Sequence, residues 1–247
     1  PSRASPRCSI RSMLLLLLHA LWAGAEESVR VELPTLGSVE GYGTDDADYF
    51  LGIPYAKPPV ADLRFRPAQP PKPWFPDVLD ATGYKANCLQ SKTWWVSANS
   101  SSEDCLYLNI ITPIGHSQAK SEDKLAPVLI YIHGGGFVHG SGSVWNMTRY
   151  AKEHGLVTAT LNYRLGALGH LALREFEKED PQFPSNGGMN FLHDQIMALK
   201  FLKANIKYFG GNPDNITVFG ESAGGISVCM LLFSPHARGL FEKAGIQ

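Results

Sequence analysis

The chain has 247 residues, of which 44% are hydrophobic and 18% are charged, so it is long enough and apolar enough to bury a large core. This composition excludes a disordered or fibrous protein. The net charge of −1 and the lack of any block of like charge give no electrostatic argument for binding a nucleic acid or an anionic membrane surface. We therefore expect a folded domain that acts on a small molecule.

Residues 1–25 are expected to be upstream residues and a signal peptide. Residue 1 is proline, so we assign Met13 as the initiator. The leucine run 14–18 leads to the small residues 23–25, which fit a signal peptidase site before Glu26. The apolar run is too short to span a bilayer comfortably. We expect a secreted protein whose domain starts at residue 26.

The next segments alternate apolar and polar residues. Residues 29–33, 37–42 and 49–53 are therefore expected to form short antiparallel strands. Eight prolines between residues 54 and 76 exclude a helix or a central strand, which indicates a loop packed on the core. The apolar side chains available for this packing are Leu63, Phe65, Trp74 and Phe75.

Three cysteines follow the expected cleavage site. Cys88 and Cys105 are 17 positions apart in a loop-rich region of a chain expected to be secreted, so we pair them. Closing this loop would stabilise the fold by roughly 3 kcal/mol. Cys229 lies in an apolar run and is predicted to be a buried free thiol.

Three sequons mark possible glycosylation sites. Asn99 lies in a polar loop and, together with Asn146, is a candidate for carrying a glycan. Asn215 borders a buried strand, which disfavours modification there.

The second half of the chain has an α/β pattern. Apolar residues at helical spacing run from Leu192 to Ile206 and stop at Gly210 and Gly211. A new strand is expected to open at residue 243. Short runs typical of strands buried on both faces are residues 106–111, 128–132, 156–161 and 216–219. This order predicts a mostly parallel, doubly wound sheet with helices on both faces and a site at the carboxyl ends of its strands.

Residues 219–225 join the last of these strands to a helical run through a Gly-x-Ser-x-Gly pattern. Such an elbow holds its serine in a strained turn, and the residues two before and two after it must lack bulk, as Gly220 and Gly224 do. The turn exposes the Ser222 hydroxyl and directs the Ala223 amide toward the same space. The alternative is a chance match in a loop.

A second glycine motif, residues 133–137 (HGGGF), directly follows the strand predicted at 128–132. Residues without side chains let backbone amides approach a tetrahedral intermediate closely, as an oxyanion hole requires. On its own the motif would be read as a flexible turn. The serine elbow downstream favours the oxyanion hole.

Five segments resemble the type-B carboxylesterase and cholinesterase family of α/β-hydrolases. Residues 103–110 (EDCLYLNI) resemble its cysteine signature, and residues 209–219 with the elbow resemble its active-serine signature. Residues 52–56, 63–65 and 162–164 are similar to other recurring segments of the family. The resemblance covers the chain after the signal peptide.

The resemblance implies that Ser222 is the nucleophile, that the amides of Gly135, Gly136 and Ala223 form the oxyanion hole, and that no metal or organic cofactor is needed. It also implies a disulfide between Cys88 and Cys105. In this family the acid and the histidine of the triad follow far downstream of the serine. The chain ends 25 residues after Ser222, so we expect both partners to be missing from it.

Histidines already present are expected to have other roles. His133 and His139 flank the glycine loop and are interpreted as structural or pocket-lining residues. His193 and Asp194 fall near a helix start, where the Asp194 charge suits the helix dipole. Glu221 resembles a buried family residue near the site that points away from the serine proton, so we place it in the pocket and not in the triad.

Substrate choice depends on Trp95, the other candidate pocket residue. It lies ten residues before Cys105, the spacing at which cholinesterases place the tryptophan that binds a quaternary ammonium group. A tryptophan in a packed loop is also a common apolar anchor, which is the alternative.

The leading functional hypothesis is a serine carboxylic ester hydrolase acting on a small ester, with no nucleic acid, metal or membrane partner indicated. The rival is a non-catalytic cholinesterase-like adhesion or binding domain, because some members of the resembled family have lost the serine. A third interpretation is an incomplete translation without independent function.

Overall fold

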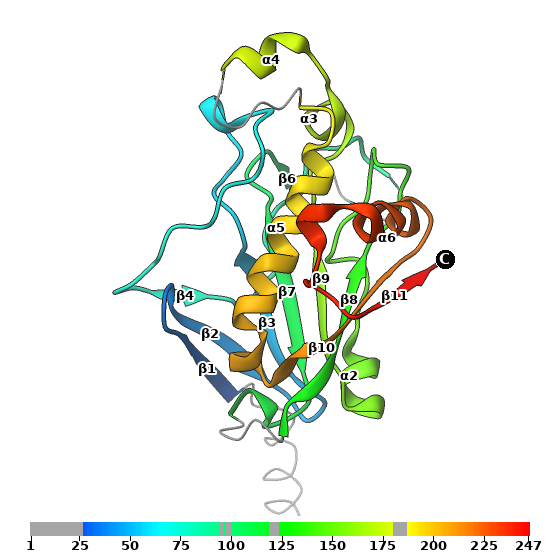
Figure 1. The fold of residues 1–247 in the computed structure, drawn as a ribbon. Coiled ribbons are helices and arrows are strands. Elements are labelled where there is room, and N and C mark those ends of the chain that lie inside the picture. The colour runs from blue at the N-terminus through cyan, green and yellow to red at the C-terminus, as the bar shows by residue number, and fades with distance from the viewer. Residues whose placement is uncertain (1–26, 94–95, 97–99, 119–123, 180–186) are drawn as a thin grey trace, which may run out of the picture.

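The computed structural model describes residues 27–93, 96, 100–118, 124–179 and 187–247 (Figure 1). The predicted signal peptide, Trp95 and Asn99 therefore lie outside the described residues. Within the described part of the chain, no helix is long and apolar enough to cross a membrane.

The centre of the molecule is a nine-stranded sheet with the order β1-β2-β3-β7-β9-β8-β10-β11, in which β4 also pairs with β2. Its N-terminal strands are β1 (Glu27–Leu33), β2 (Gly37–Gly43), β3 (Asp48–Pro54), β4 (Val78–Asp80) and β7 (Tyr107–Thr112). Its later strands are β8 (Ala126–Ile132), β9 (Val157–Leu161), β10 (Gly211–Gly220) and β11 (Lys243–Ile246). Two short strands, β5 (Asn87–Cys88) and β6 (Ser101–Ser102), pair separately.

The sheet is mixed. β1, β2, β3, β7 and β9 pair in antiparallel fashion, whereas β9, β8, β10 and β11 are parallel. The expected antiparallel start, the four buried strands and the strand opening at residue 243 are all confirmed. The fold is α/β-hydrolase-like, and the predicted doubly wound character is found in its parallel part.

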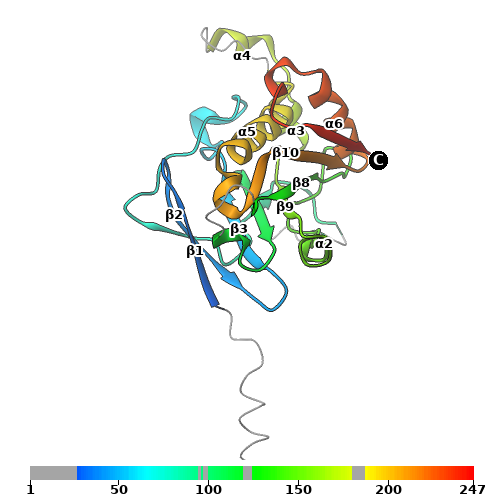
Figure 2. The ribbon, with the colours of Figure 1, turned by 60° about the horizontal axis from the view of Figure 1, so that its bottom comes forward.

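Helices cover both faces of the sheet (Figure 2). α5 (Asn190–Asn205) and α6 (Ala223–Phe233) pack on one face, and α2 (Thr148–His154) packs on the other. β8 shows why both faces need cover: Ile130 belongs to the main core with α5, whereas Tyr131 belongs to a second apolar cluster that contains Ala151 of α2. Alternating side chains of one strand thus supply two apolar layers.

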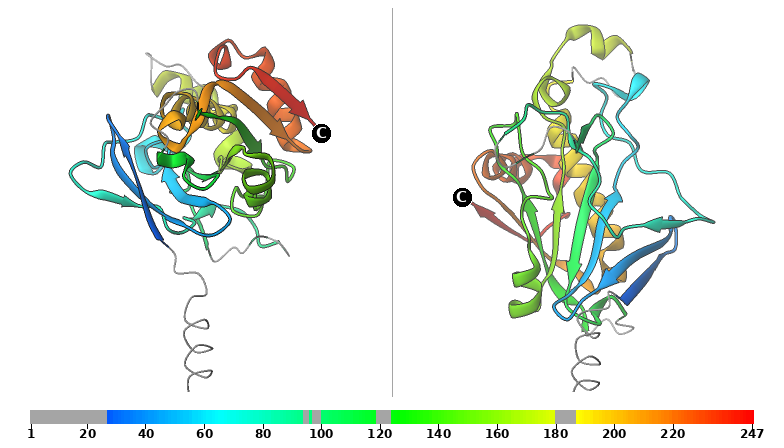
Figure 3. Two further views of the ribbon diagram at one scale, coloured as in Figure 1. Left: turned by 90° about the horizontal axis from the view of Figure 1, so that it is seen from below. Right: turned by 180° about the vertical axis from the view of Figure 1, so that it is seen from behind.

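The carboxyl ends of β8 and β10 point toward the end of the molecule that carries α3 (Gly166–His170) and α4 (Arg174–Glu179), as the front and back views show (Figures 1 and 3). The predicted helix is confirmed as α5. It continues through a 3₁₀ turn to Gly210, whose φ of 82° is a left-handed conformation that glycine adopts without strain.

The proline-rich segment is a loop, and its packing differs from the prediction at one residue. Trp74 packs against the core, and its Nε1 donates a hydrogen bond to the Ser38 carbonyl oxygen at 2.8 Å. The prediction that Phe75 is buried is wrong, because its side chain is 78% exposed. The two are adjacent, and packing Trp74 inward turns the next side chain toward solvent.

Cys229 is a free cysteine, as predicted, but the prediction that it is buried is wrong. It lies on the outer side of α6, in an open cleft of about 520 Å³. The cleft is lined by Met189, Leu192, Ile226, Cys229, Met230, Phe233 and Ser234. α6 is apolar around its whole circumference, so its sequence does not mark which side faces the core.

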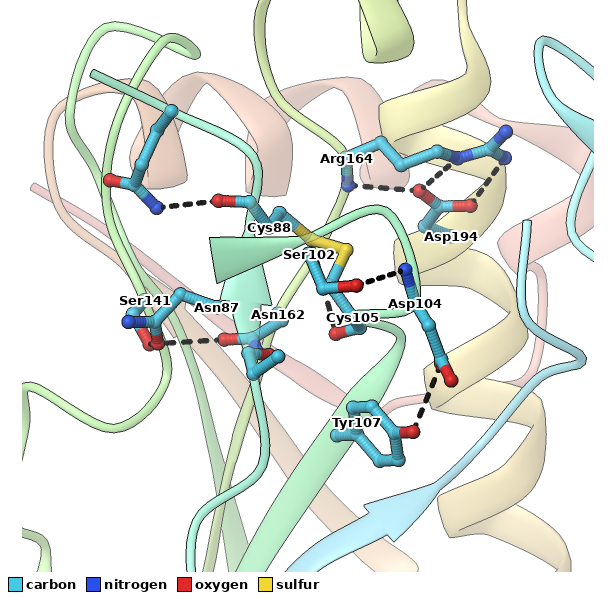
Figure 4. Close-up of a disulfide and its surroundings, with 12 residues drawn as sticks. Asn87, Cys88, Ser102, Asp104, Cys105, Tyr107, Ser141, Asn162, Arg164 and Asp194 are labelled. Atoms are coloured by element: carbon cyan, nitrogen blue, oxygen red, sulfur yellow. Dashed lines mark hydrogen bonds and ion pairs between the residues drawn. A yellow bond between two sulfur atoms is a disulfide. The ribbon is translucent and has the colours of Figure 1, made fainter. Parts of the chain in front are cut away.

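The predicted disulfide between Cys88 and Cys105 is confirmed, with Cα atoms 4.9 Å apart (Figure 4). Both cysteines are buried. The bridge lies beside a hydrogen bond from the Tyr107 hydroxyl to the Asp104 carboxylate at 2.9 Å. It therefore ties residues 87–88 to the start of β7, close to the carboxyl end of the neighbouring β9.

Candidate active site

Ser222 occupies the turn between β10 and α6, where its φ is 56° and its ψ is −122°. This backbone conformation is unfavourable for a residue with a Cβ and persists only where neighbours hold it. Here the Ser222 amide donates to the Gln247 carbonyl oxygen at 2.7 Å, and the Ser222 carbonyl oxygen accepts from the Ile226 amide at 2.9 Å. The turn thus has the strained geometry expected of a nucleophile elbow.

The glycines on either side of the elbow are required by packing. A Cβ added at Gly220 would overlap the Gly224 carbonyl oxygen, and one added at Gly224 would overlap the Ile132 carbonyl oxygen. In both cases the obstacle is backbone, which moves less readily than a flexible side chain. The motif's small residues therefore allow β10, α6 and the end of β8 to meet.

Replacing Gly224 with alanine should lower the free energy of unfolding by about 1–3 kcal/mol, because the added methyl group must displace β8. Urea unfolding of the two proteins measures this difference. Gly83→Ala is the matched control, since a Cβ there meets no atom within 4 Å. Equal stability of the Gly224 and Gly83 variants would contradict the packing argument.

The glycine loop after β8 lies directly against the elbow. A Cβ at Gly134 would be 3.1 Å from the Ser222 Cβ and 2.7 Å from the Glu221 carbonyl oxygen. Gly135 and Gly136 have φ values of 105° and 60°, which favour glycine. Among the residues that the structure describes, none accepts a hydrogen bond from the amides of Gly135, Gly136 or Ala223. The structure thus brings together Ser222 and the glycine loop that sequence analysis paired with it.

The glycine loop is held by hydrogen bonds within its own backbone and by packing against α5. The Val138 and His139 amides both donate to the Gly135 carbonyl oxygen at 3.1 Å. Phe137 packs edge-on against Phe191 of α5, with ring centroids 5.0 Å apart. The Gly166 amide, at the start of α3, donates to the Phe137 carbonyl oxygen at 2.8 Å.

His133 is a structural residue of this loop, which agrees with its predicted role. It is buried, its ring stacks on Tyr163 with centroids 4.3 Å apart, and its Nδ1 lies 2.8 Å from the Gly134 carbonyl oxygen. The carbonyl only accepts, so Nδ1 carries the proton. Burial lowers the pKa of His133 to about 4, so the imidazole is neutral near pH 7.

Acid should therefore destabilise the fold through His133. The unfolded chain binds a proton at this histidine near pH 6.5, whereas the folded chain does so only near pH 4. As the pH is lowered from 6.5 to 4, the free energy of unfolding should fall by on the order of 3 kcal/mol. This contribution should be constant above pH 6.5 and below pH 4. The pH dependence of urea unfolding should be shallower in His133→Gln than in the exposed-histidine control His154→Gln. Equal slopes in that window would contradict the assignment.

The Glu221 carboxylate lies close to Gly134 of the glycine loop. Its Oε2 lies 2.8 Å from the position of a Cβ at Gly134. Burial and the Glu221 carboxylate raise the pKa of Tyr131 to about 12. The Glu221 carboxylate thus lies beside Tyr131 and the glycine loop.

Asp194 has a role that the sequence interpretation missed. It lies beyond the first turn of α5, so its expected pairing with the helix dipole is wrong. Instead Asp194 accepts hydrogen bonds from Nε and Nη2 of Arg164 at 2.9 and 2.7 Å, and from the Arg164 amide at 3.0 Å (Figure 4). Their side chains are 0% and 3% exposed. This buried pair holds the chain after β9 to α5.

Asn146 lies away from this site, on the exposed turn before α2, where its Oδ1 accepts from the Thr148 amide at 2.8 Å. No group of three or more His, Cys, Asp and Glu side chains suited to a metal ion occurs among the described residues.

Comparisons with known proteins identify the family to which these features belong. The model of the carboxylesterase family matches residues 26–247. The chain belongs to the carboxylesterase family. Para-nitrobenzyl esterase of Bacillus subtilis is 43% identical to it in an alignment 214 positions long, which covers 84% of this chain and 41% of that protein. Cocaine esterase of Homo sapiens is 39% identical in an alignment 259 positions long, which covers 98% of this chain and 44% of that protein.

Solved carboxylesterase structures agree in fold. A PNB esterase structure superposes with a TM-score of 0.74 at 43% identity, covering 88% of this chain and 44% of its own. The carboxylesterase of Geobacillus stearothermophilus gives a TM-score of 0.76 at 40% identity, covering 87% and 42%. This carboxylesterase-family chain thus spans less than half the length of the relatives that it matches.

Proposed function

We propose that this chain is the N-terminal part of a serine carboxylic ester hydrolase, with its catalytic domain beginning at residue 26. In the proposed reaction, Ser222 Oγ bonds to the ester carbonyl carbon, the π electron pair moves to oxygen, and a base takes the hydroxyl proton. Collapse of this oxyanion breaks the ester C–O bond, the protonated base donates its proton to the departing alkoxide to give the alcohol, and an acyl-enzyme remains. Water, deprotonated by the same base, then attacks the acyl carbon, and collapse of the second oxyanion releases the acid and the protonated Ser222 hydroxyl. The amides of Gly135, Gly136 and Ala223 stabilise both oxyanions.

The observation that carries this proposal is the positive φ of Ser222 at a strand-to-helix turn that lies against a glycine loop. A serine with a merely structural role has no need of a strained backbone beside three successive glycines. The strain is offset by the hydrogen bonds of the Ser222 amide and carbonyl, which is the expected arrangement where the geometry itself serves the chemistry.

The triad acid and base are proposed to lie beyond Gln247. Among the described residues, none makes a hydrogen bond to Ser222 Oγ, and His133 is committed to the Gly134 carbonyl oxygen. An unassisted serine hydroxyl is a weak nucleophile, so the 247 residues alone should turn over esters very slowly.

Several further features support a small ester as substrate in a secretory environment. The names of relatives include para-nitrobenzyl esterase and fatty acyl-CoA hydrolase, and the proposed chemistry needs neither metal nor organic cofactor. The disulfide favours an oxidising compartment, and Asn146 is exposed for a glycan. A choline ester specificity would depend on Trp95.

The alternative is a non-catalytic binding domain of the same family. Hydrolysis of p-nitrophenyl butyrate by the full-length protein distinguishes the two. We expect saturable turnover. A role for Trp95 in binding the ammonium group requires faster hydrolysis of butyrylcholine than of a matched butyryl ester without the choline group, and equal rates on the two would rule it out. A folded full-length protein that hydrolyses no ester would favour the binding domain.

A further inference from the structure

We propose that Gln90 is a positioning residue for the glycine loop, holding the proposed oxyanion amides through the backbone of Gly140. This inference rests on the proposed function, since it concerns how the donors of that site are fixed. Among the described residues, the Gln90 side chain hydrogen-bonds to Gly140 and Cys88 and not to Ser222 or the glycines 134–136.

One side chain satisfies both backbone groups of one residue. The Gln90 Nε2 donates to the Gly140 carbonyl oxygen at 2.8 Å, and the Gly140 amide donates to the Gln90 Oε1 at 2.8 Å. The Gln90 Nε2 also donates to the Cys88 carbonyl oxygen at 3.0 Å. The side-chain amide of Gln90 thus bonds both the amide and the carbonyl of Gly140, which fixes the position and orientation of the Gly140 backbone.

Fixing the Gly140 backbone also constrains the glycine loop, because Gly140 packs closely against it. Its φ is 129°, and a Cβ there would overlap the ring of His133 and lie 2.6 Å from the Gly134 carbonyl oxygen. A Cβ added at Gly135 would overlap the carbonyl oxygen of His139, the residue before Gly140. A shift of Gly140 therefore moves the backbone that packs against Gly134 and Gly135.

The segment that carries Gln90 is fixed by the disulfide. Gln90 follows Cys88 by two residues, and the disulfide fixes Cys88 to Cys105. Asn87 adds a parallel connection, because its Oδ1 accepts a hydrogen bond from the Ser141 hydroxyl at 2.5 Å (Figure 4). The disulfide-linked segment is thereby joined to the loop at two successive residues, 140 and 141.

The contacts favour positioning over simple stabilisation. Gln90 is only half-buried, so shortening its side chain leaves no closed cavity in the core. Two of its three side-chain hydrogen bonds go to the backbone of Gly140 in the loop, and the third goes to the carbonyl oxygen of Cys88 in the short strand β5. Loss of Gln90 should therefore loosen the loop more than it destabilises the domain.

The test uses Gln90→Ala and Gln90→Glu in the full-length protein. Gln69→Ala is the control, because Gln69 is also half-buried and accepts one side-chain hydrogen bond, from Lys57. For Gln90→Ala we expect kcat for p-nitrophenyl butyrate to fall roughly 10-fold, less than for deleting a donor outright, with KM within about twofold of wild type. Gln90→Glu should not restore the rate, since a carboxylate accepts from the Gly140 amide but cannot donate to its carbonyl.

The second readout is inhibition by a trifluoromethyl ketone, which forms a hemiketal oxyanion with the serine. Its inhibition constant should rise by the same factor by which kcat/KM falls, at an unchanged unfolding midpoint. If the wild type is active and Gln90→Ala has an unchanged kcat and an unchanged inhibition constant, the role of Gln90 is overturned and the proposed function stands. A loss of rate explained by a lowered unfolding midpoint would overturn it as well. An inactive wild type would overturn the proposed function and, with it, this inference.

Discussion

Replacing Ser222 with alanine in the full-length protein should lower kcat for ester hydrolysis by on the order of 10³-fold or more. The substitution removes the atom that forms the acyl-enzyme and leaves the glycine loop and the elbow in place. Alanine tolerates a φ of 56° no better than serine does, so the strain and the stability should be similar. Steady-state kinetics on p-nitrophenyl butyrate, with urea unfolding alongside, measures both quantities.

Ser234→Ala is the matched control, because Ser234 lies at the other end of α6 and should retain wild-type kinetics. We expect the loss of activity to be confined to the Ser222 variant. Retention of more than a tenth of the wild-type kcat in Ser222→Ala would show that another residue provides the nucleophile.

Replacing Asp194 with asparagine should destabilise the fold by about 3–5 kcal/mol. The substitution nearly preserves volume but leaves the Arg164 guanidinium buried without its counter-charge. The double variant Arg164→Met with Asp194→Leu should recover most of the loss, because replacing a whole buried ion pair by apolar side chains is often neutral or stabilising. Urea unfolding of the three proteins measures these differences.

The exposed pair Arg149–Glu153 on α2 provides the control. Glu153→Gln should leave the free energy of unfolding close to that of wild type, since solvent screens exposed pairs. If Asp194→Asn were equally mild, the Arg164–Asp194 pair would not hold the chain after β9 to α5 as described.

The sequence predicted features whose causes are local. A glycine two residues to either side of a serine, after a β-rich run, encodes the elbow in five residues, and the positive φ of Ser222 is what that pattern implies. The periodicity of α5 and its stop at Gly210 were likewise readable from neighbouring positions. Cys88 and Cys105 were recoverable because so few cysteines were available to pair.

Features that depend on distant residues were not predictable. Arg164 and Asp194 are 30 positions apart, and Gln90 and Gly140 are 50 apart, so no local spacing connects them. The prediction that Cys229 is buried was wrong for another reason. A helix that is apolar on every side does not show in its sequence which side faces the core.

The most direct test of the account is to label the full-length protein with a fluorophosphonate and map the adduct by peptide mass spectrometry. We expect one adduct per chain, on Ser222, formed at a rate that falls together with ester hydrolysis when Gln90 is replaced by alanine. An adduct on any other residue, or none on a folded protein, would contradict the assignment of Ser222 as the nucleophile of a carboxylic ester hydrolase.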